Sequence, residues 1–140
     1  MSGVADQALF SLVHDFLKKY LPLQRRSSPN TISSYRIALE QLFEYVKKQH
    51  QVPIHGVSFS MLSADVIAGF LDFLEIERKC SIATRNQRLA AIRAFLKYAA
   101  AMDITTVSAY IETDRVPFKK PITLEPVGNM SEAAIKALLD

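Results

Sequence analysis

Two segments of the chain carry only positive charge, a pattern typical of a surface that meets a polyanion. Residues 16–39 and 78–102 contain no acidic side chain, whereas every charge between residues 49 and 77 is negative. The cations are Lys18, Lys19, Arg25, Arg26 and Arg36, then Arg78, Lys79, Arg85, Arg88, Arg93 and Lys97; the anions are Asp65, Asp72, Glu75 and Glu77. A basic side attracts nucleic acid through its field and through counterion release. A solvated surface without a partner is the alternative.

Polar side chains near two predicted helix starts could contact phosphates and base edges. Backbone N–H groups and hydroxyls at Thr31, Ser33 and Ser34 suit a phosphate, although helix capping explains Thr31 equally well. Gln87 can pair with an adenine edge and Arg88 with guanine or phosphate, unless both lie on an ordinary solvated face. The candidate DNA-binding residues are Thr31, Ser33, Ser34, Arg36, Thr84, Arg85, Gln87, Arg88, Lys119 and Lys120.

The helix that carries Gln87 has two polar flanks, and its sequence does not decide between them. Ala91 and Ala94 follow on the Gln87 side, where small residues would let the helix approach DNA. The other flank carries Asn86, Arg93 and Lys97.

Other chemistries lack suitable residues. The three histidines show no metal-ligand spacing and Cys80 stands alone, so we expect neither a metal site nor an internal disulfide. No glycine-rich phosphate loop indicates nucleotide hydrolysis, and no cofactor is expected. The five tyrosines lie inside predicted helices and are interpreted as packed aromatics rather than nucleophiles. A single cysteine, and no run near the roughly 18 apolar residues of a membrane span, favour a cytoplasmic protein.

The elements that position these residues are predicted to be helical throughout. The chain has 140 residues, 49% of them hydrophobic, and only 4 glycines, which favours an all-α domain with a packed core. Apolar spacing predicts a helix over about 5–20, a second that opens at residues 28–31 and fades near 51, a third that starts at 63, a fourth that begins near 81 or 82, and a short fifth over about 104–111. Pro22 is expected to end the first, and Ser28, with Pro29 behind it, to begin the second. The third is expected to be the most buried, and its Gly69 to be tolerated only if a neighbour packs closely there.

Three prolines and a glycine between Thr113 and Asn129 predict an extended linker, after which Ser131 starts another helix that is cut off at Asp140. We therefore divide the chain into a helical domain over 1–113, a linker over 114–130, and the start of a second, truncated domain over 131–140. Lys119 and Lys120 in the linker could follow a nucleic-acid backbone, although unbound linker lysines are equally common.

Four motifs resemble those of one family, in the same order and spacing. The run from Ser28 to Tyr35 looks like the S-x-N-T-x-x-x-Y helix start of phage-integrase N-terminal, SAM-like domains. The runs 62–67 and 83–95 are similar to that family's entry to helix three and its fourth-helix motif, and 121–139 to the linker and first helix of its catalytic domain. Arg85 departs from the family, which often has an apolar residue there; we expect its stem on the core edge and its guanidinium pointing outward.

The resemblance implies a four- to five-helix SAM-like core-binding bundle of a tyrosine site-specific recombinase, acting in DNA integration and recombination. In such enzymes this domain and the catalytic domain clamp duplex DNA from opposite faces, the second and fourth helices lie at the major groove, and other recombinase protomers join a synaptic complex. The family's catalytic residues, which form a 3′-phosphotyrosyl link, all lie in the catalytic domain, so no residue of this chain inherits a catalytic role. The alternatives are a helical protein–protein interaction module and, third, a small enzyme with a buried site.

Overall fold

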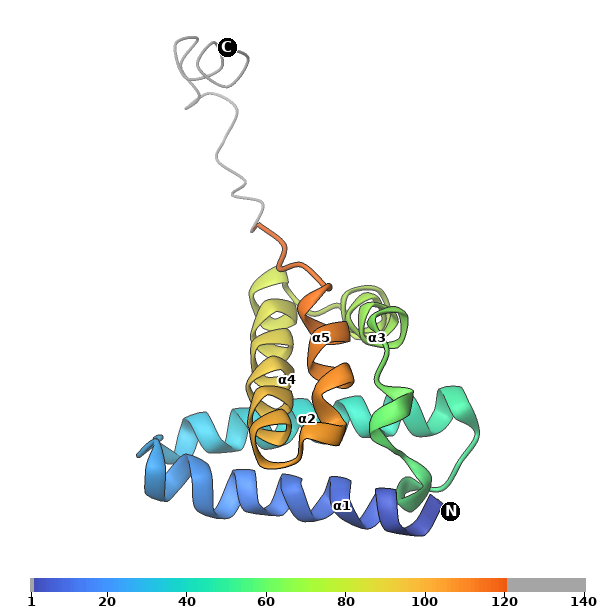
Figure 1. The fold of residues 1–140 in the computed structure, drawn as a ribbon. Coiled ribbons are helices and arrows are strands. Elements are labelled where there is room, and N and C mark those ends of the chain that lie inside the picture. The colour runs from blue at the N-terminus through green and yellow to red at the C-terminus, as the bar shows by residue number, and fades with distance from the viewer. Residues whose placement is uncertain (1, 121–140) are drawn as a thin grey trace, which may run out of the picture.

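The computed structural model describes residues 2–120 of the chain, and within them the fold is helical (Figure 1). The α-helices are α1 (Ser2–Asp15), α2 (Pro29–His50), α3 (Ala64–Ile76), α4 (Ile82–Met102) and α5 (Val107–Asp114). Short helical turns are η2 (Ile54–Gly56), η3 (Phe59–Met61) and η4 (Ile104–Thr106). No β-strand occurs among these residues, so the predicted all-α class is confirmed. The predicted helix over 131–140 lies outside the described residues.

Pro22 does not end the first helix, so that prediction was wrong. The chain continues from α1 into η1 (Phe16–Gln24), a π-helical segment with Pro22 inside it. A proline has no N–H to donate and its ring clashes with the carbonyl four residues earlier, and the wider π turn relieves that clash. The N–H of Arg25 donates to the carbonyl of Tyr20 at 2.9 Å, five residues back. Arg26, with a left-handed φ of 50°, then turns the chain toward α2.

Serine caps fix the starts of α2, α3 and α4. The hydroxyl oxygens of Ser28, Ser63 and Ser81 each accept the backbone N–H three residues ahead, at 3.2, 3.2 and 3.1 Å. Such a cap satisfies one of the N–H groups that a helix start leaves without a partner, and contributes about 1 kcal/mol. The predicted starts at Ser28 and Ser63, and the start near Ser81, are therefore confirmed.

Helix α4, rather than α3, forms the centre of the bundle. It packs against α2, α3, α5 and η4, and seven of its residues are buried against four in α3. The prediction that α3 is the most buried helix was therefore wrong. Arg85, Ala91 and Ala99 are among the buried residues of α4. Because none of them is a large apolar residue, the sequence of α4 looks less hydrophobic than that of α3.

An aromatic cluster joins α4 to η1 and to α2. Phe16 is fully buried, and its ring lies 6.0 Å from that of Tyr35 in α2 and 5.5 and 5.4 Å from those of Phe95 and Tyr98 in α4. Aromatic pairs at such separations contribute beyond the area that they bury. All five tyrosines pack against the core, as predicted.

Gly69 marks a close approach between α3 and α2. A Cβ atom at this position would lie 2.7 Å from the hydroxyl oxygen of Tyr45. The expected close neighbour of this helical glycine is therefore present.

We predict that the effect of Gly69→Ala depends on Tyr45. In the wild-type background the new methyl meets the tyrosine hydroxyl, so the free energy of unfolding should not rise. In a Tyr45→Phe background the hydroxyl is absent, and the same change should raise that free energy by roughly 0.5–1 kcal/mol through helix propensity. Urea unfolding of the four proteins measures the coupling. Equal effects in both backgrounds would show that the two side chains do not interact.

Candidate nucleic-acid interface

The first turns of α2 carry four of the predicted contact residues. Thr31 belongs to the cap, because its hydroxyl accepts a hydrogen bond from Ser28 at 3.0 Å. The guanidinium of Arg36 donates to the hydroxyl of Ser33 at 3.5 Å, and Arg36 is exposed. Ser34 is half-buried. This end of α2 therefore presents one exposed cation and an ordered helix start.

The start of α4 repeats the geometry of the start of α2. Ser81 donates to the hydroxyl of Thr84 at 3.2 Å and accepts the backbone N–H of the same residue. Both helices therefore begin with a serine and threonine three residues apart, joined by the same two bonds. Thr84, like Thr31, is engaged in capping.

Gln87 and Arg88, the two predicted base-reading residues, are joined to each other and to α2. The Nε of Arg88 donates to the side-chain oxygen of Gln41 at 2.9 Å, and another nitrogen of its guanidinium donates to the side-chain oxygen of Gln87. Both residues are half-buried. The Gln87 amide keeps its NH₂ group as a donor, whereas Arg88 bridges α4 to α2.

The guanidinium of Arg85 does not point outward, so that expectation was wrong. Arg85 is only 4% exposed, and its guanidinium donates to the carbonyl of Pro117 and to the side-chain oxygen of Asn86, both at 2.9 Å. Its Nε is buried without a partner. The chain that follows α5 passes over this position and encloses the side chain.

The same chain covers one of the two polar flanks of α4. Asn86 and Arg93 both bond to the backbone of residues 114–119. The ammonium group of Lys119 is ion-paired with Glu75 of α3, at 2.7 Å between the charged atoms, so its charge is directed to α3. Lys120 is exposed.

The uncovered face of α4 is lined with small residues. Ala83, Ala90 and Ala101 are exposed and Ala94 is half-buried. Ala91 is fully buried, so placing it on the exposed Gln87 side was wrong. Ala91 lies between the exposed alanines and the buried stripe of Ile92 and Phe95, and the core covers it.

A hollow of about 540 Å³ continues this face and adds residues that sequence reasoning missed. Four aromatic side chains line it, and Arg25, Ser27 and Lys97 contribute polar groups to its lining. Burial, with the nearby carboxylate of Asp15 second, raises the pKa of Tyr98 in this lining above its ordinary value, which disfavours the phenolate. Arg25 belongs to the first basic segment of the sequence, but its place beside α4 could not be predicted, because that place depends on the helix continuing through Pro22.

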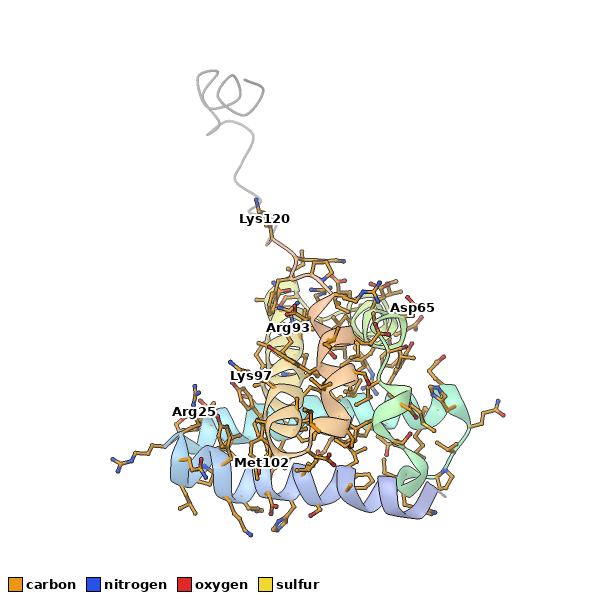
Figure 2. The ribbon with its side chains drawn as sticks, in the orientation of Figure 1. Arg25, Asp65, Arg93, Lys97, Met102 and Lys120 are labelled. Atoms are coloured by element: carbon orange, nitrogen blue, oxygen red, sulfur yellow. The ribbon has the colours of Figure 1, made fainter. Side chains whose placement is uncertain are left out.

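The two cations of the hollow lie apart from the acidic start of α3. Figure 2 shows Arg25 and Lys97 on one side of the bundle and Asp65, at the start of α3, on the other. The structure thus brings Arg25 and Lys97 to one surface but does not place all ten predicted contact residues there. Within residues 2–120, no group of three His, Cys, Asp or Glu side chains could hold a metal ion. No helix in this part of the chain is long and apolar enough to cross a membrane.

Comparison with known proteins gives several matches. The model of a family described as the phage integrase SAM-like domain matches residues 9–116. The chain is 35% identical over 132 residues to y4rC of Sinorhizobium fredii, described as an integrase/recombinase, covering 94% of this chain and 40% of the relative. It is 31% identical over 111 residues to tyrosine recombinase XerD of Oceanobacillus iheyensis, covering 78% of this chain and 35% of that relative. The chain spans less than half the length of these relatives. No solved structure matches it.

We predict that Arg85 matters for its volume more than for its charge. Arg85→Ala removes a buried stem and should lower the free energy of unfolding by roughly 2–3 kcal/mol, whereas Arg85→Met keeps the volume and should stay within about 1 kcal/mol of wild type. Urea unfolding measures both. Binding of duplex DNA by Arg85→Met should match wild type, because the guanidinium is enclosed. Loss of that binding by a folded Arg85→Met protein would contradict this assignment.

Proposed function

This chain belongs to the phage integrase SAM-like domain family, and we propose on that basis that it is the duplex-DNA-binding domain of a tyrosine site-specific recombinase. Relatives at 31–35% identity are tyrosine recombinases or are described as integrases and recombinases. In this proposal the chain holds DNA in the cytoplasm during integration or recombination, and other recombinase protomers join it in a synaptic complex.

One observation carries the proposal: α4 has a single uncovered polar flank, and a hollow with two cations continues it. The flank of Asn86 and Arg93 is occupied by residues 114–119. Gln87 and Ala94 lie on the free side. Lys97, one turn beyond Arg93 on the other flank, is exposed past the reach of residues 114–119 and lines the hollow with Ala94 and Arg25. DNA approaching α4 therefore has one side available, and that side carries positive charge.

The small residues of this face fit the approach of a helix to a duplex. An α-helix enters the major groove only if its exposed side chains leave room for the base edges. Exposed alanines at 83, 90 and 101 leave that room, and the NH₂ group of Gln87 can donate to a base acceptor. Arg25, Arg36 and Lys97 are placed to neutralise phosphates along the rim.

Strand cleavage is proposed to belong to the part of the recombinase that this chain does not contain. Phosphoryl transfer to a tyrosine needs a positioned nucleophile and several cationic donors that converge on one phosphate. In the described residues, the tyrosines pack against the core and the arginines nearest to α4 bond to carbonyls or to glutamine. We therefore propose that the chain binds DNA without cutting it.

A protein–protein interaction module is the second candidate, because α5 and the turn before it expose apolar side chains. Ile104 is 79% exposed and Ile111 56%. Burial of apolar surface depends little on salt at moderate concentration, whereas phosphate neutralisation depends on it steeply. Salt dependence of binding therefore distinguishes the two functions.

We predict that Lys97 neutralises a phosphate and that Lys48, an exposed lysine near the C-terminal end of α2, does not. Nonspecific duplex affinity should lie in the range of about 10⁻⁴ to 10⁻⁶ M, and log K should fall linearly with log[salt]. Lys97→Gln should reduce the slope by roughly 0.9, the value for one lost phosphate contact. Fluorescence anisotropy with a labelled duplex at several salt concentrations measures the slope.

Lys48→Gln is the matched control, since it removes the same charge from an exposed side chain that lines a different hollow, between α2 and α3. Its slope should equal that of wild type. Equal slopes for Lys97→Gln and wild type would exclude α4 as the DNA-facing helix, and a flat salt dependence for every protein would reject DNA binding.

We also predict that this chain leaves a suicide substrate with the recombination site uncut. All five tyrosines are half-buried and pack against the core, so none is presented as a fully exposed nucleophile. Denaturing gel electrophoresis detects covalent protein–DNA adducts, and a full-length relative that forms the adduct on its own site is the positive control. An adduct formed by this chain and abolished by changing one of its own tyrosines to phenylalanine would contradict the proposal that the chain binds DNA without cutting it.

A further inference from the structure

Residues 114–119, the last residue of α5 and the five that follow it, lie against α4 through their backbone. The carbonyls of Asp114 and Val116 both accept hydrogen bonds from the guanidinium of Arg93, the former at 3.2 Å. The carbonyl of Pro117 accepts one from Arg85 at 2.9 Å. Side chains about two turns apart on α4 therefore reach the same short segment.

Asn86 recognises the last residue of this segment at two points. Its side-chain NH₂ donates to the carbonyl of Lys119 at 2.6 Å, and its side-chain oxygen accepts the N–H of the same residue at 3.0 Å. This pairing copies the exchange of two hydrogen bonds between paired strands. Only an amide side chain offers both a donor and an acceptor in that arrangement.

Side chains of the segment add contacts on either side of this backbone pairing. Val116 is 3% exposed and belongs to the core cluster. The ring of Phe118 lies 4.5 Å from the guanidinium carbon of Arg93, within range of a cation–π interaction. Lys119 reaches across to Glu75 of α3. The segment is thus attached to two helices, although it has no regular secondary structure after α5.

The burial of Arg85 and Arg93 lowers the stability of the fold in one respect, which indicates that the two side chains do more than fill space. The Nε atoms of both Arg85 and Arg93 are buried without a partner, and an unmade hydrogen bond of a buried donor opposes folding. Both guanidinium groups nevertheless direct other nitrogens to backbone carbonyls of one segment. These bonds hold the backbone of the segment in one position along α4.

We propose that residues 114–119 form a clasp on α4 that sets the direction in which the chain leaves the helical domain, and that Asn86 is its positioning residue. The helical domain then extends to Lys119 rather than ending near residue 113. Lys120 lies beyond the N-terminal end of α4, as Figure 2 shows. The relatives are more than twice as long as this chain, so in a full-length protein the clasp aims the segment that leads to the next domain. The clasp itself does not depend on the proposed DNA binding.

The distance between two spin labels tests the clasp on this chain. One label is placed at exposed Ser11 in α1 and the other at exposed Lys120, in a Cys80→Ser background, and double electron–electron resonance gives the distance distribution. The clasp should give a narrow distribution. Asn86→Ala should widen it by roughly twofold, because the freed residues sample many conformations.

Gln87→Ala is the matched control for this measurement. It removes the neighbouring amide side chain from the same turn of α4, and the Gln87 side-chain oxygen accepts from Arg88 rather than from residues 114–119. Its distribution should equal that of wild type. A wide distribution in the wild-type protein, or equal widths for Asn86→Ala and wild type, would overturn the proposal.

Amide hydrogen exchange gives a second readout that separates the clasp from general stability. The N–H of Lys119 should be protected in wild type and should exchange roughly tenfold or more faster in Asn86→Ala, while the amides inside α4 keep their protection. Unprotected exchange at Lys119 in wild type would reject the clasp. Parallel loss of protection throughout α4 would assign Asn86 a structural role only. Neither experiment uses DNA, so failure of the clasp proposal can be told apart from failure of the proposed DNA-binding function.

Discussion

The packing of α4 on several sides is the constraint from which the other features of this molecule follow. Helices α2, α3 and α5 surround it, and its buried residues form the middle of the core. One flank is then closed by residues 114–119, which leaves a narrow face of alanines with Gln87 and Lys97. Since the remaining surface is so limited, the position of any macromolecule that approaches α4 is also limited.

The basic segment around α4 shows that charges adjacent in sequence can have different roles. Arg85 and Arg93 hold backbone carbonyls of a distant segment, Arg88 bridges to Gln41 of α2, and Lys97 is exposed beside the hollow. A guanidinium suits the first two roles because its stem packs on apolar surface while its planar head donates in several directions. Net charge therefore overstates the number of cations that are free to meet a polyanion.

The connection between α1 and α2 shows how a local irregularity positions a surface. The π-helical turn carries the chain past Pro22 and keeps Phe16 in contact with aromatic rings of α2 and α4. As a result Arg25 lies beside Lys97 at the hollow. A helix that ended at Tyr20 would leave that position undefined.

The sequence by itself determined the all-α class, the serine caps, the close neighbour of Gly69 and the family, since each depends on local spacing or on motifs that short stretches contain. It did not determine which cations are free, because that depends on segments about 30 residues apart in the chain, such as Asn86 and Lys119. It also missed the burial of Ala91 and the hollow at Arg25, since exposure is decided by the neighbours that a helix acquires on folding. Only the tertiary structure placed residues 114–119 on α4, because backbone carbonyls leave no trace in the pattern of side chains.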